Sequence, residues 1–205
     1  MEIEAKFAVP DMSTFQRLLA AKTLAGMRLV AGTTQEIHDR YLDTPDQAIR
    51  RGGYACRLRQ RAGKRLLTFK GLGGAAGAIH QRAEHETTLP AGASLVPTSW
   101  PNGPARDLAE KLCQDQPLET LFDLHQTRHI RMLANGDRTI AELSLDEVQV
   151  GATVYLELEV ELTLNGTMDD LRRIAHDLVT TWHLAPEPRS KFELALATLD
   201  IQRGL

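Results

Sequence analysis

Carboxylate side chains recur at every second position in two stretches of the chain. Glu157, Glu159 and Glu161 alternate with apolar residues, and Glu2 and Glu4 precede Lys6 in the same alternation. A β-strand points successive side chains to opposite faces, so each stretch predicts a strand with one charged and one apolar face. Hard divalent cations such as Mg²⁺ and Mn²⁺ prefer oxygen ligands. Both strands are therefore candidates for metal ligation.

A basic hairpin is predicted over residues 54–71. Arg57, Arg59 and Arg61 alternate with uncharged residues on its first strand, and Lys70 lies on its return strand. Guanidinium and ammonium groups suit phosphate oxygens, and like charges on neighbouring strands weaken a sheet unless an anion neutralises them. The hairpin is therefore either an anion site or an exposed basic surface, and its sequence alone does not distinguish the two.

Further strands with mixed charge are predicted over residues 80–89, 127–133 and 139–148. Arg82, Glu84 and Glu86 share one face of the first, and Glu142, Ser144 and Asp146 share one face of the last. If all the charged faces point inward, they line one site. If they point outward, the protein has a solvated, salt-bridged sheet and no site.

Amphipathic helices are available to cover the apolar faces of these strands. A helix is predicted from Asp11 to a stop at Gly26, another follows Thr167, and a final one begins at residues 189–193. Apolar spacing between residues 108 and 122 predicts two short helices, the first marked by Leu108 and Leu112, the second by Leu118, Leu121 and Phe122. The economical arrangement is an α+β fold in which a closed antiparallel barrel has helices outside and charges inside.

Such a barrel interior is hydrophilic, because unpaired ions in a dry core cost too much free energy. It is best described as a hydrated tunnel. Basic side chains for phosphate and carboxylates for divalent metal, combined in one lining, match a metal-complexed polyphosphate.

Composition sets further limits. The 205 residues are 42% hydrophobic with a net charge of -3, which predicts a globular protein of one domain, 1–205, without a basic surface for nucleic acid. Cys56 and Cys113 lack the spacing of a disulfide framework or a thiolate metal site. No signal segment and no apolar run of about 18 residues is found, so we expect a cytoplasmic protein that does not enter membranes.

Eight short motifs occur in order along the chain: Glu2-x-Glu4-x-Lys6, Tyr41-x-Asp43-Thr44-Pro45, Arg57-x-Arg59, Thr68-x-Lys70, Arg82-x-Glu84-x-Glu86, Asp146, Glu157-x-Glu159-x-Glu161 and Ser190-Lys191. This series resembles the CYTH superfamily, the triphosphate tunnel metalloenzymes. His80-Gln81-Arg82 and Trp100-Pro101-Asn102-Gly103 are similar to the bacterial inorganic triphosphatases, in which a helical CHAD domain follows the CYTH domain. A CHAD domain is thus a partner expected in longer relatives.

The resemblance implies an eight-stranded antiparallel barrel around a tunnel, and it implies roles for particular residues. The substrate phosphates are assigned to Lys6, Arg57, Arg59, Lys70, Arg82, Arg128 and Lys191, with Arg131 as the alternative to Arg128. The metal ligands are assigned to Glu2, Glu4, Glu159 and Glu161, with Glu157 as a further candidate. Supporting roles fall to Glu84, Glu86, Glu142 and Asp146.

The reaction implied is hydrolysis of the terminal phosphoanhydride of inorganic triphosphate, assisted by two Mg²⁺ or Mn²⁺ ions, with Glu2, Glu4, Lys6 and Lys191 as the catalytic set. An adenylate cyclase, or a thiamine or nucleoside triphosphatase, would have the same lining. A non-catalytic polyphosphate-binding module is a rival of a different class. The substrate is in every case a small molecule that contains a triphosphate.

Overall fold

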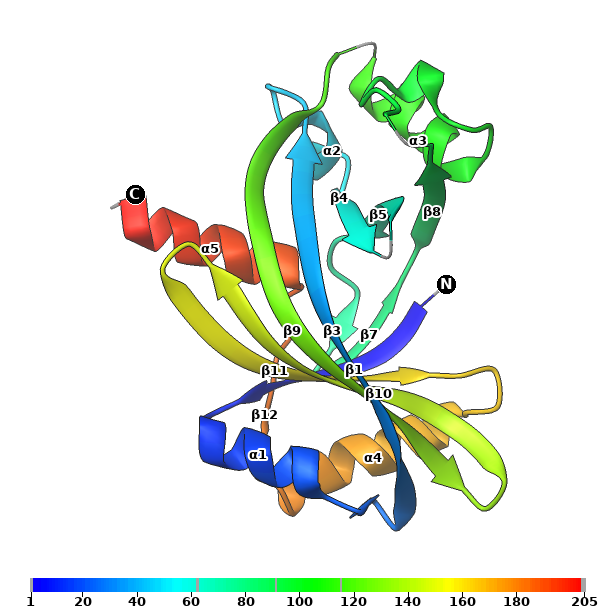
Figure 1. Cartoon of the computed structure of the whole chain (residues 1–205), viewed down its shortest axis with the longest axis vertical. Helices are drawn as coiled ribbons and strands as arrows, with labels where there is room; N and C mark the ends of the chain where they lie inside the picture. The colour runs from blue at the N-terminus through cyan, green and yellow to red at the C-terminus, as the bar shows by residue number, and fades with distance from the viewer. Residues whose placement is uncertain (1, 62, 91, 115, 204–205) are drawn as a thin grey trace.

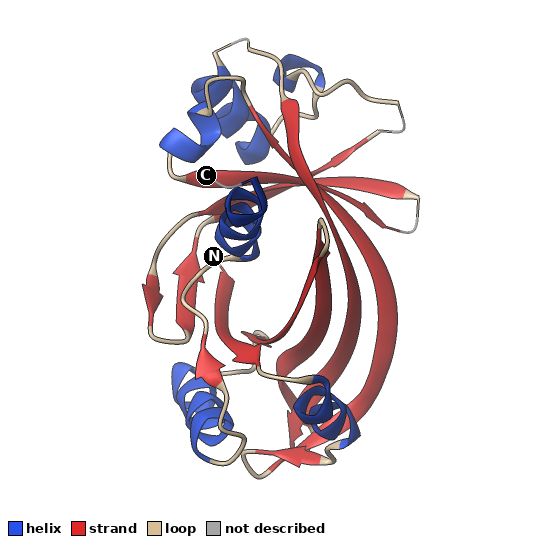
Figure 2. Cartoon of the chain, turned by 90° about the vertical axis from the view of Figure 1, so that its left-hand side faces the viewer, coloured by secondary structure: helices blue, strands red, loops and turns tan. Residues whose placement is uncertain are grey.

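A large antiparallel sheet, bent around a central region, organises the chain in the computed structural model (Figures 1 and 2). The structure describes residues 2–61, 63–90, 92–114 and 116–203. In chain order the strands are β1 (Glu2–Val9), β2 (Thr23–Leu24), β3 (Met27–Asp43), β4 (Tyr54–Arg61), β5 (Lys64–Gly71), β6 (Ala75–Ala76), β7 (Ile79–Arg82), β8 (Glu84–Leu89), β9 (Glu119–Asn135), β10 (Arg138–Val150), β11 (Thr153–Leu162) and β12 (Ala185–Pro186).

The helices are α1 (Met12–Ala20), α2 (Ala48–Arg51), α3 (Pro104–Cys113), α4 (Met168–Thr180) and α5 (Lys191–Arg203), with one 3-10 turn, η1 (Pro97–Ser99). The fold is therefore α+β, as the alternation and the helical spacing predict.

The sheet runs in the order β6-β7-β1-β11-β10-β9-β3-β4-β5-β8, and within the described residues no hydrogen-bonded ladder joins its two ends. The closed barrel expected from the sequence is therefore not established by hydrogen bonds. The two ends are nevertheless neighbours along the chain, because β7 and β8 are separated only by Ala83. β7 pairs with β1, and β8 pairs with β5.

The apolar face of β1 packs outward against helices, as predicted. Ala5 and Phe7 are fully buried in one cluster with Phe15 of α1 and Ile174 of α4, and Figure 1 shows both helices lying across the lower part of the sheet. Burying a side chain such as Phe7 stabilises the fold by about 1.5–3 kcal/mol. This packing fixes the opposite face of β1, which carries the charges, toward the interior.

A second core lies at the other end of the sheet. There α2, α3 and η1 cover β4 and β5, with Cys56, Phe69, Trp100 and Cys113 all buried. Both cysteines are free thiols. A third cluster joins α5 to β3 and β9 through residues such as Tyr41, Phe122 and Phe192.

One predicted helix is wrong. Leu118 lies before β9, and Leu121 and Phe122 lie within it, because β9 begins at Glu119 instead of near Thr127. The apolar residues of this segment are three and four positions apart, which is the spacing of a helix. In the strand, alternation prevails: Phe122 and Leu124 are buried, while Asp123 and His125 face outward.

A bulge bends β3 where it crosses β9. The register shifts between Val30 and Thr33, and the backbone of Gly32 lies so close to Ile130 that a Cβ there would stand 1.5 Å from its carbonyl oxygen. Only glycine fits this approach. The bend allows two 17-residue strands to curve around the interior.

Candidate functional site

A cavity of about 340 Å³ lies on the inner side of the strands. Every basic residue that was assigned to phosphate lines it, namely Lys6, Arg57, Arg59, Lys70, Arg82, Arg128 and Lys191. Six carboxylates share the lining: Glu2, Glu4, Glu84, Glu86, Glu159 and Glu161. The charged faces thus converge on one place.

Strand register explains the convergence. On β1 and β11, Lys6 lies opposite Glu159 and Glu4 opposite Glu161; on β10, Asp146 lies opposite Glu157. Residues two positions apart on one strand share a face. When one charged residue of a strand points to the cavity, the charged residues two positions before and after it do so too. The three remaining predicted residues are not part of the cavity lining. Glu157 and Asp146 lie behind the lining, and Glu142 lies opposite Glu161 on the neighbouring strand.

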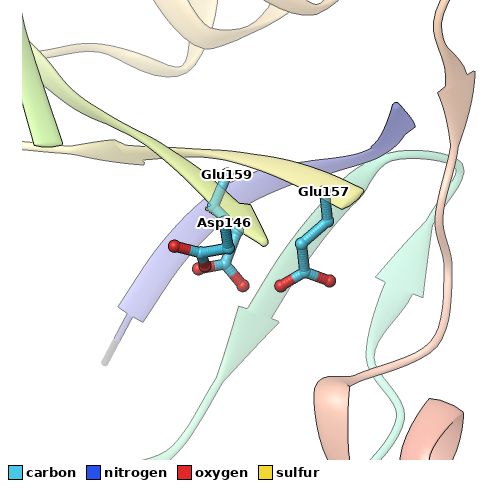
Figure 3. Close-up of side chains that lie close together, drawn as sticks. All are labelled: Asp146, Glu157 and Glu159. Carbon is cyan, nitrogen blue, oxygen red and sulfur yellow. The ribbon is translucent and has the colours of Figure 1, made fainter. Parts of the chain in front are cut away.

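Three carboxylates form a tight group, and among the described residues they are the one set of three or more acidic, histidine or cysteine side chains whose ligand atoms lie close together. Ligand oxygens of Asp146, Glu157 and Glu159 lie within 4.8 Å of one another (Figure 3). Distance alone suggests a metal centre.

Their partners indicate an ion-pair cluster instead. The ammonium of Lys191 is 2.9 Å from Asp146 and 2.8 Å from Glu159, and it also contacts Glu157. Lys6 lies 3.3 Å from both Glu157 and Glu159. Arg128 approaches Asp146 to 2.5 Å and Glu159 to 2.6 Å. Three carboxylates therefore face three cations, and the group is already neutral.

The pKa values in this cluster follow from that balance. Burial by itself would lower the pKa of Lys6, but Glu157 and Glu159 outweigh it and raise the pKa above its usual value. Burial would likewise raise the pKa of Glu159, yet Lys191, Lys6 and Arg128 hold it well below its usual range. Lys6 and Glu159 are therefore both charged at neutral pH.

A second cluster fixes the arginines of β4. Asp39 of β3 is fully buried and accepts two hydrogen bonds from Arg59, each 2.7 Å long. Arg57 lies 3.6 Å from the same carboxylate, and the amide of Gln126 donates to it at 3.2 Å. Asp39 thus holds both arginines in position at the cavity wall.

A row of carboxylates crosses three strands, and its middle residue lacks such compensation. Glu161 of β11 lies between Glu4 of β1 and Glu142 of β10 in the strand register. Burial, and then the carboxylates of Glu2, Glu4 and Glu142, raise the pKa of Glu161 to about 7, although Lys70 opposes them. Within the described chain, no basic side chain forms an ion pair with Glu161. Negative charge therefore accumulates at this row.

The donor set around this row fits a divalent cation. Glu4 pairs with Arg82, and Glu2 with Lys70 at 2.7 Å, but Oε2 of Glu2 is buried without a hydrogen-bond partner in the described structure. Unpaired carboxylate oxygens beside a repelling carboxylate are what a hard cation would satisfy. The fit is better here than at the neutral Asp146 group.

Lys191 is positioned by the start of α5. The hydroxyl of Ser190 accepts from the backbone N–H of Glu193 at 3.2 Å, and the Glu193 carboxylate accepts from the N–H of Ser190 at 2.8 Å. This reciprocal pair is a capping box. It fixes the first turn of α5, so that Lys191 enters the cavity while Phe192 packs against Tyr41.

Some residues of the site were not predicted. Asp39 shares its strand face with Ile37 and Tyr41, so charge alternation does not single it out; its position opposite Arg59 is the feature that reveals it. Tyr41 and Phe192 form an apolar side of the cavity that the charge pattern also missed.

The choice between Arg128 and Arg131 is clear in the structure. Arg128 lines the cavity, whereas Arg131 points to the other face and donates to backbone carbonyls, including that of Ala21 at 2.6 Å. The two are three residues apart and so lie on opposite faces of β9.

The CYTH domain family matches residues 1–187. The chain belongs to the CYTH family. This is a family of metal-dependent triphosphate tunnel proteins that bind substrates containing a triphosphate, and the CYTH match covers all the strands that line the cavity.

Solved structures share the CYTH fold. HpAC1 from Hippeastrum, a candidate adenylyl cyclase with a dominant triphosphatase activity, aligns with a TM-score of 0.77 at 20% identity over 97% of this chain and 96% of that chain. A candidate adenylate cyclase of Bacillus halodurans aligns with a TM-score of 0.69 at 21% identity, over 94% of this chain and 96% of that chain. PH1819 of Pyrococcus horikoshii aligns with a TM-score of 0.58 at 21% identity, over 97% of this chain and 99% of that chain. At these identities the likeness establishes the fold alone.

Membrane insertion through a helix has no support here: none of the helices in the described residues is long and apolar enough to cross a bilayer.

Proposed function

We propose that this protein is a metal-dependent hydrolase that cleaves the terminal phosphoanhydride of inorganic triphosphate. One observation carries the proposal: seven basic side chains and six carboxylates line a single cavity. Cations alone would suit any anion. Cations interleaved with carboxylates suit an anion that arrives with metal ions.

The charge balance supports the need for metal. Asp39, Asp146 and Glu157 lie behind the lining and neutralise several of its cations, so the carboxylates of the site outnumber its basic groups. A triphosphate carries several negative charges of its own. Binding it without further cations would add repulsion to a site that is already net negative.

The proposed metal ligands are Glu2, which has a buried oxygen without a hydrogen-bond partner in the described structure, Glu161, whose charge is uncompensated, and Glu4, which lies opposite Glu161. Glu159 and Glu157 extend this set once Lys6 and Lys191 turn toward phosphate. A bound Mg²⁺ or Mn²⁺ ion would neutralise charge on the phosphate oxygens and activate water for in-line attack.

The basic residues bind and orient the substrate. Nε of Arg57 and Nε of Arg82 are buried without hydrogen-bond partners among the described residues, so each offers a donor to a phosphate oxygen. Lys6 and Lys191 are charged, because the neighbouring carboxylates outweigh burial and raise the pKa of each ammonium group. Together these groups would stabilise the charge that develops on the transferred phosphoryl group and on the leaving pyrophosphate.

We also infer that the strands enclose a tunnel. The continuous stretch 79–89 supports this, since its first half pairs with one end of the sheet and its second half with the other. The ring would then be completed by the chain itself at Ala83.

A nucleoside triphosphate is the second candidate substrate. Tyr41, Leu72 and Phe192 line the same cavity as the cations, and aromatic rings are surfaces on which a base could stack. This observation keeps a nucleoside triphosphatase and an adenylate cyclase as alternatives.

The deciding experiment is a product analysis with tripolyphosphate, ATP and thiamine triphosphate, each with Mg²⁺ or Mn²⁺. The proposal predicts the highest kcat/KM for tripolyphosphate, with orthophosphate and pyrophosphate as products. Cyclic AMP as the main product from ATP would show a cyclase instead. Tight binding of tripolyphosphate without turnover would show a binding module.

A further inference from the structure

Two histidines lie side by side on the face of the sheet that points away from the cavity. His38 of β3 and His125 of β9 are directly opposite in the strand register. Their neighbours in sequence, Asp39 and Gln126, point inward and form the arginine cluster. The histidine pair is therefore separated from the proposed triphosphate site by the thickness of the sheet.

The rings are held parallel. Their centroids are 4.3 Å apart and their planes differ by 12°. The His38 ring is anchored, because its Nε2 lies 2.8 Å from a carboxylate oxygen of Asp123. The side chain of His38 is 39% exposed and that of Asp123 37%, so solvent and small ions reach the pair.

The carboxylate fixes which nitrogen of His38 is free. The same oxygen of Asp123 that lies against His38 also accepts a hydrogen bond from Nε of Arg40 at 2.9 Å, as an ionised carboxylate does. An ionised carboxylate only accepts hydrogen bonds, and Nε2 must therefore carry the proton. In the neutral ring, Nδ1 of His38 then has a free lone pair.

We propose that His38 and His125 form a binding site for a transition-metal cation of the Zn²⁺, Ni²⁺ or Cu²⁺ class, with Asp123 as the residue that orients His38. Imidazole suits these ions, whereas Mg²⁺ and Mn²⁺ prefer the oxygens of the cavity. Histidine ligands commonly donate their second nitrogen to a carboxylate, which is the contact made by His38 and Asp123.

Binding requires the exposed His125 ring to turn out of the stack. An imidazole nitrogen binds an ion in the plane of its own ring, so the two nearly parallel rings can share one ion only once their planes intersect. Two nitrogens bound tetrahedrally to zinc at about 2.0–2.1 Å stand roughly 3.4 Å apart, a separation that side chains of directly opposed strand residues can reach. Arg40 is the nearby cation, and its charge is offset by the ion pair with Asp123 at 2.9 Å. Water would complete the coordination.

The test measures Zn²⁺ binding by the whole protein in competition with a chromophoric zinc indicator, in excess Mg²⁺. We expect one Zn²⁺ per chain, with affinity at least tenfold lower in both His38→Gln and His125→Gln and about tenfold lower in Asp123→Asn. His176→Gln, which alters an exposed histidine of α4, is the matched control and should bind as the wild type does.

Ring signals of the two histidines in NMR spectra should shift together on addition of Zn²⁺. Absence of binding to the wild type would overturn the proposal, as would unchanged affinity in either histidine variant. The readout is metal binding, so the result does not depend on whether the cavity hydrolyses triphosphate.

Discussion

Asp39 and Arg59 face each other across β3 and β4, with both oxygens of the carboxylate 2.7 Å from nitrogens of the guanidinium. The pair is bidentate and almost wholly buried, and Arg57 shares the same carboxylate. The wall that would hold phosphate thus depends on an acidic residue that itself lies behind the lining.

Replacing Asp39 with Asn should leave two arginines beside a neutral group. Breaking a buried ion pair by removing one partner costs about 3–5 kcal/mol, so the free energy of unfolding in urea should fall by that order. Gln126→Ala, which removes only a hydrogen bond to Asp39, is the matched control and should cost about 1 kcal/mol. Equal losses in the two variants would contradict the role given to the ion pair.

Asp39 also predicts a pH dependence of stability. Burial would raise its pKa, but Arg57 and Arg59 outweigh burial, and the folded-state pKa lies below the usual value of 3.8. The pair therefore stabilises the fold above pH 3.8 and loses this contribution as the pH falls through the lower, folded-state pKa. Acid unfolding followed by circular dichroism should be less steep in Asp39→Asn than in the wild type below that pH. Identical acid transitions would count against this.

Glu161→Gln should have opposite effects on stability and on activity. At a pH above the Glu161 pKa of about 7, it removes a charge from the row formed with Glu4 and Glu142, so the metal-free protein should become more stable by about 0.2–1 kcal/mol. Loss of a metal ligand should raise the Mg²⁺ concentration needed for half-maximal triphosphate hydrolysis at least tenfold. Calorimetry and a metal titration measure the two effects.

Glu157→Gln is the control for the stability measurement, because it changes the same kind of side chain on the same strand, four residues from Glu161. Glu157 is paired with Lys6 and Lys191, so its replacement should destabilise the protein. A stability gain for both variants, or for neither, would refute the distinction between the compensated and the uncompensated carboxylates.

The variants Arg128→Ala and Arg131→Ala should distinguish a residue that binds substrate from a residue that supports the fold. Arg128 lines the cavity, so its loss should lower kcat/KM by roughly 10²–10³-fold. Arg131 bonds the carbonyls of Leu19, Ala21 and Leu29, so its loss should cost about 1–3 kcal/mol of stability with kcat/KM nearly unchanged. The reverse pattern would show that the cavity is not the active site.

Ser190→Ala tests how α5 positions Lys191. Loss of an N-cap hydroxyl costs about 1 kcal/mol, and the first turn of α5 should fray. We expect a lower kcat with little change in overall secondary structure, and recovery in Ser190→Thr, which retains the hydroxyl. Full activity in Ser190→Ala would show that the cap is dispensable for placing the lysine.

Charge alternation predicted the orientation of the strands well. The faces of β1, β4 and β11 were assigned correctly because each alternates strictly, so that one buried residue such as Phe7 fixes all the others. The ion-pair partners could not be predicted this way. Which carboxylate neutralises Lys191 depends on the register between β10, β11 and α5, and no local pattern encodes it.

Two other features needed the structure for physical reasons. Leu118, Leu121 and Phe122 have the spacing of a helix, and only the pairing of β9 with β3 makes Leu121 and Phe122 part of a strand. On its face of β3, Asp39 stands between the apolar residues Ile37 and Tyr41, and its function comes from an arginine on the neighbouring strand. Both are tertiary effects that override local sequence preference.

The most direct test of the account is the rate of phosphate release from tripolyphosphate by the whole protein, measured with Mg²⁺ or Mn²⁺ and again after chelation, for the wild type and for Lys6→Gln. The account predicts release of one orthophosphate per tripolyphosphate, dependent on the metal and reduced at least a hundredfold in Lys6→Gln. Tripolyphosphate that binds but is not cleaved with either metal, or cleavage that survives chelation, would contradict it.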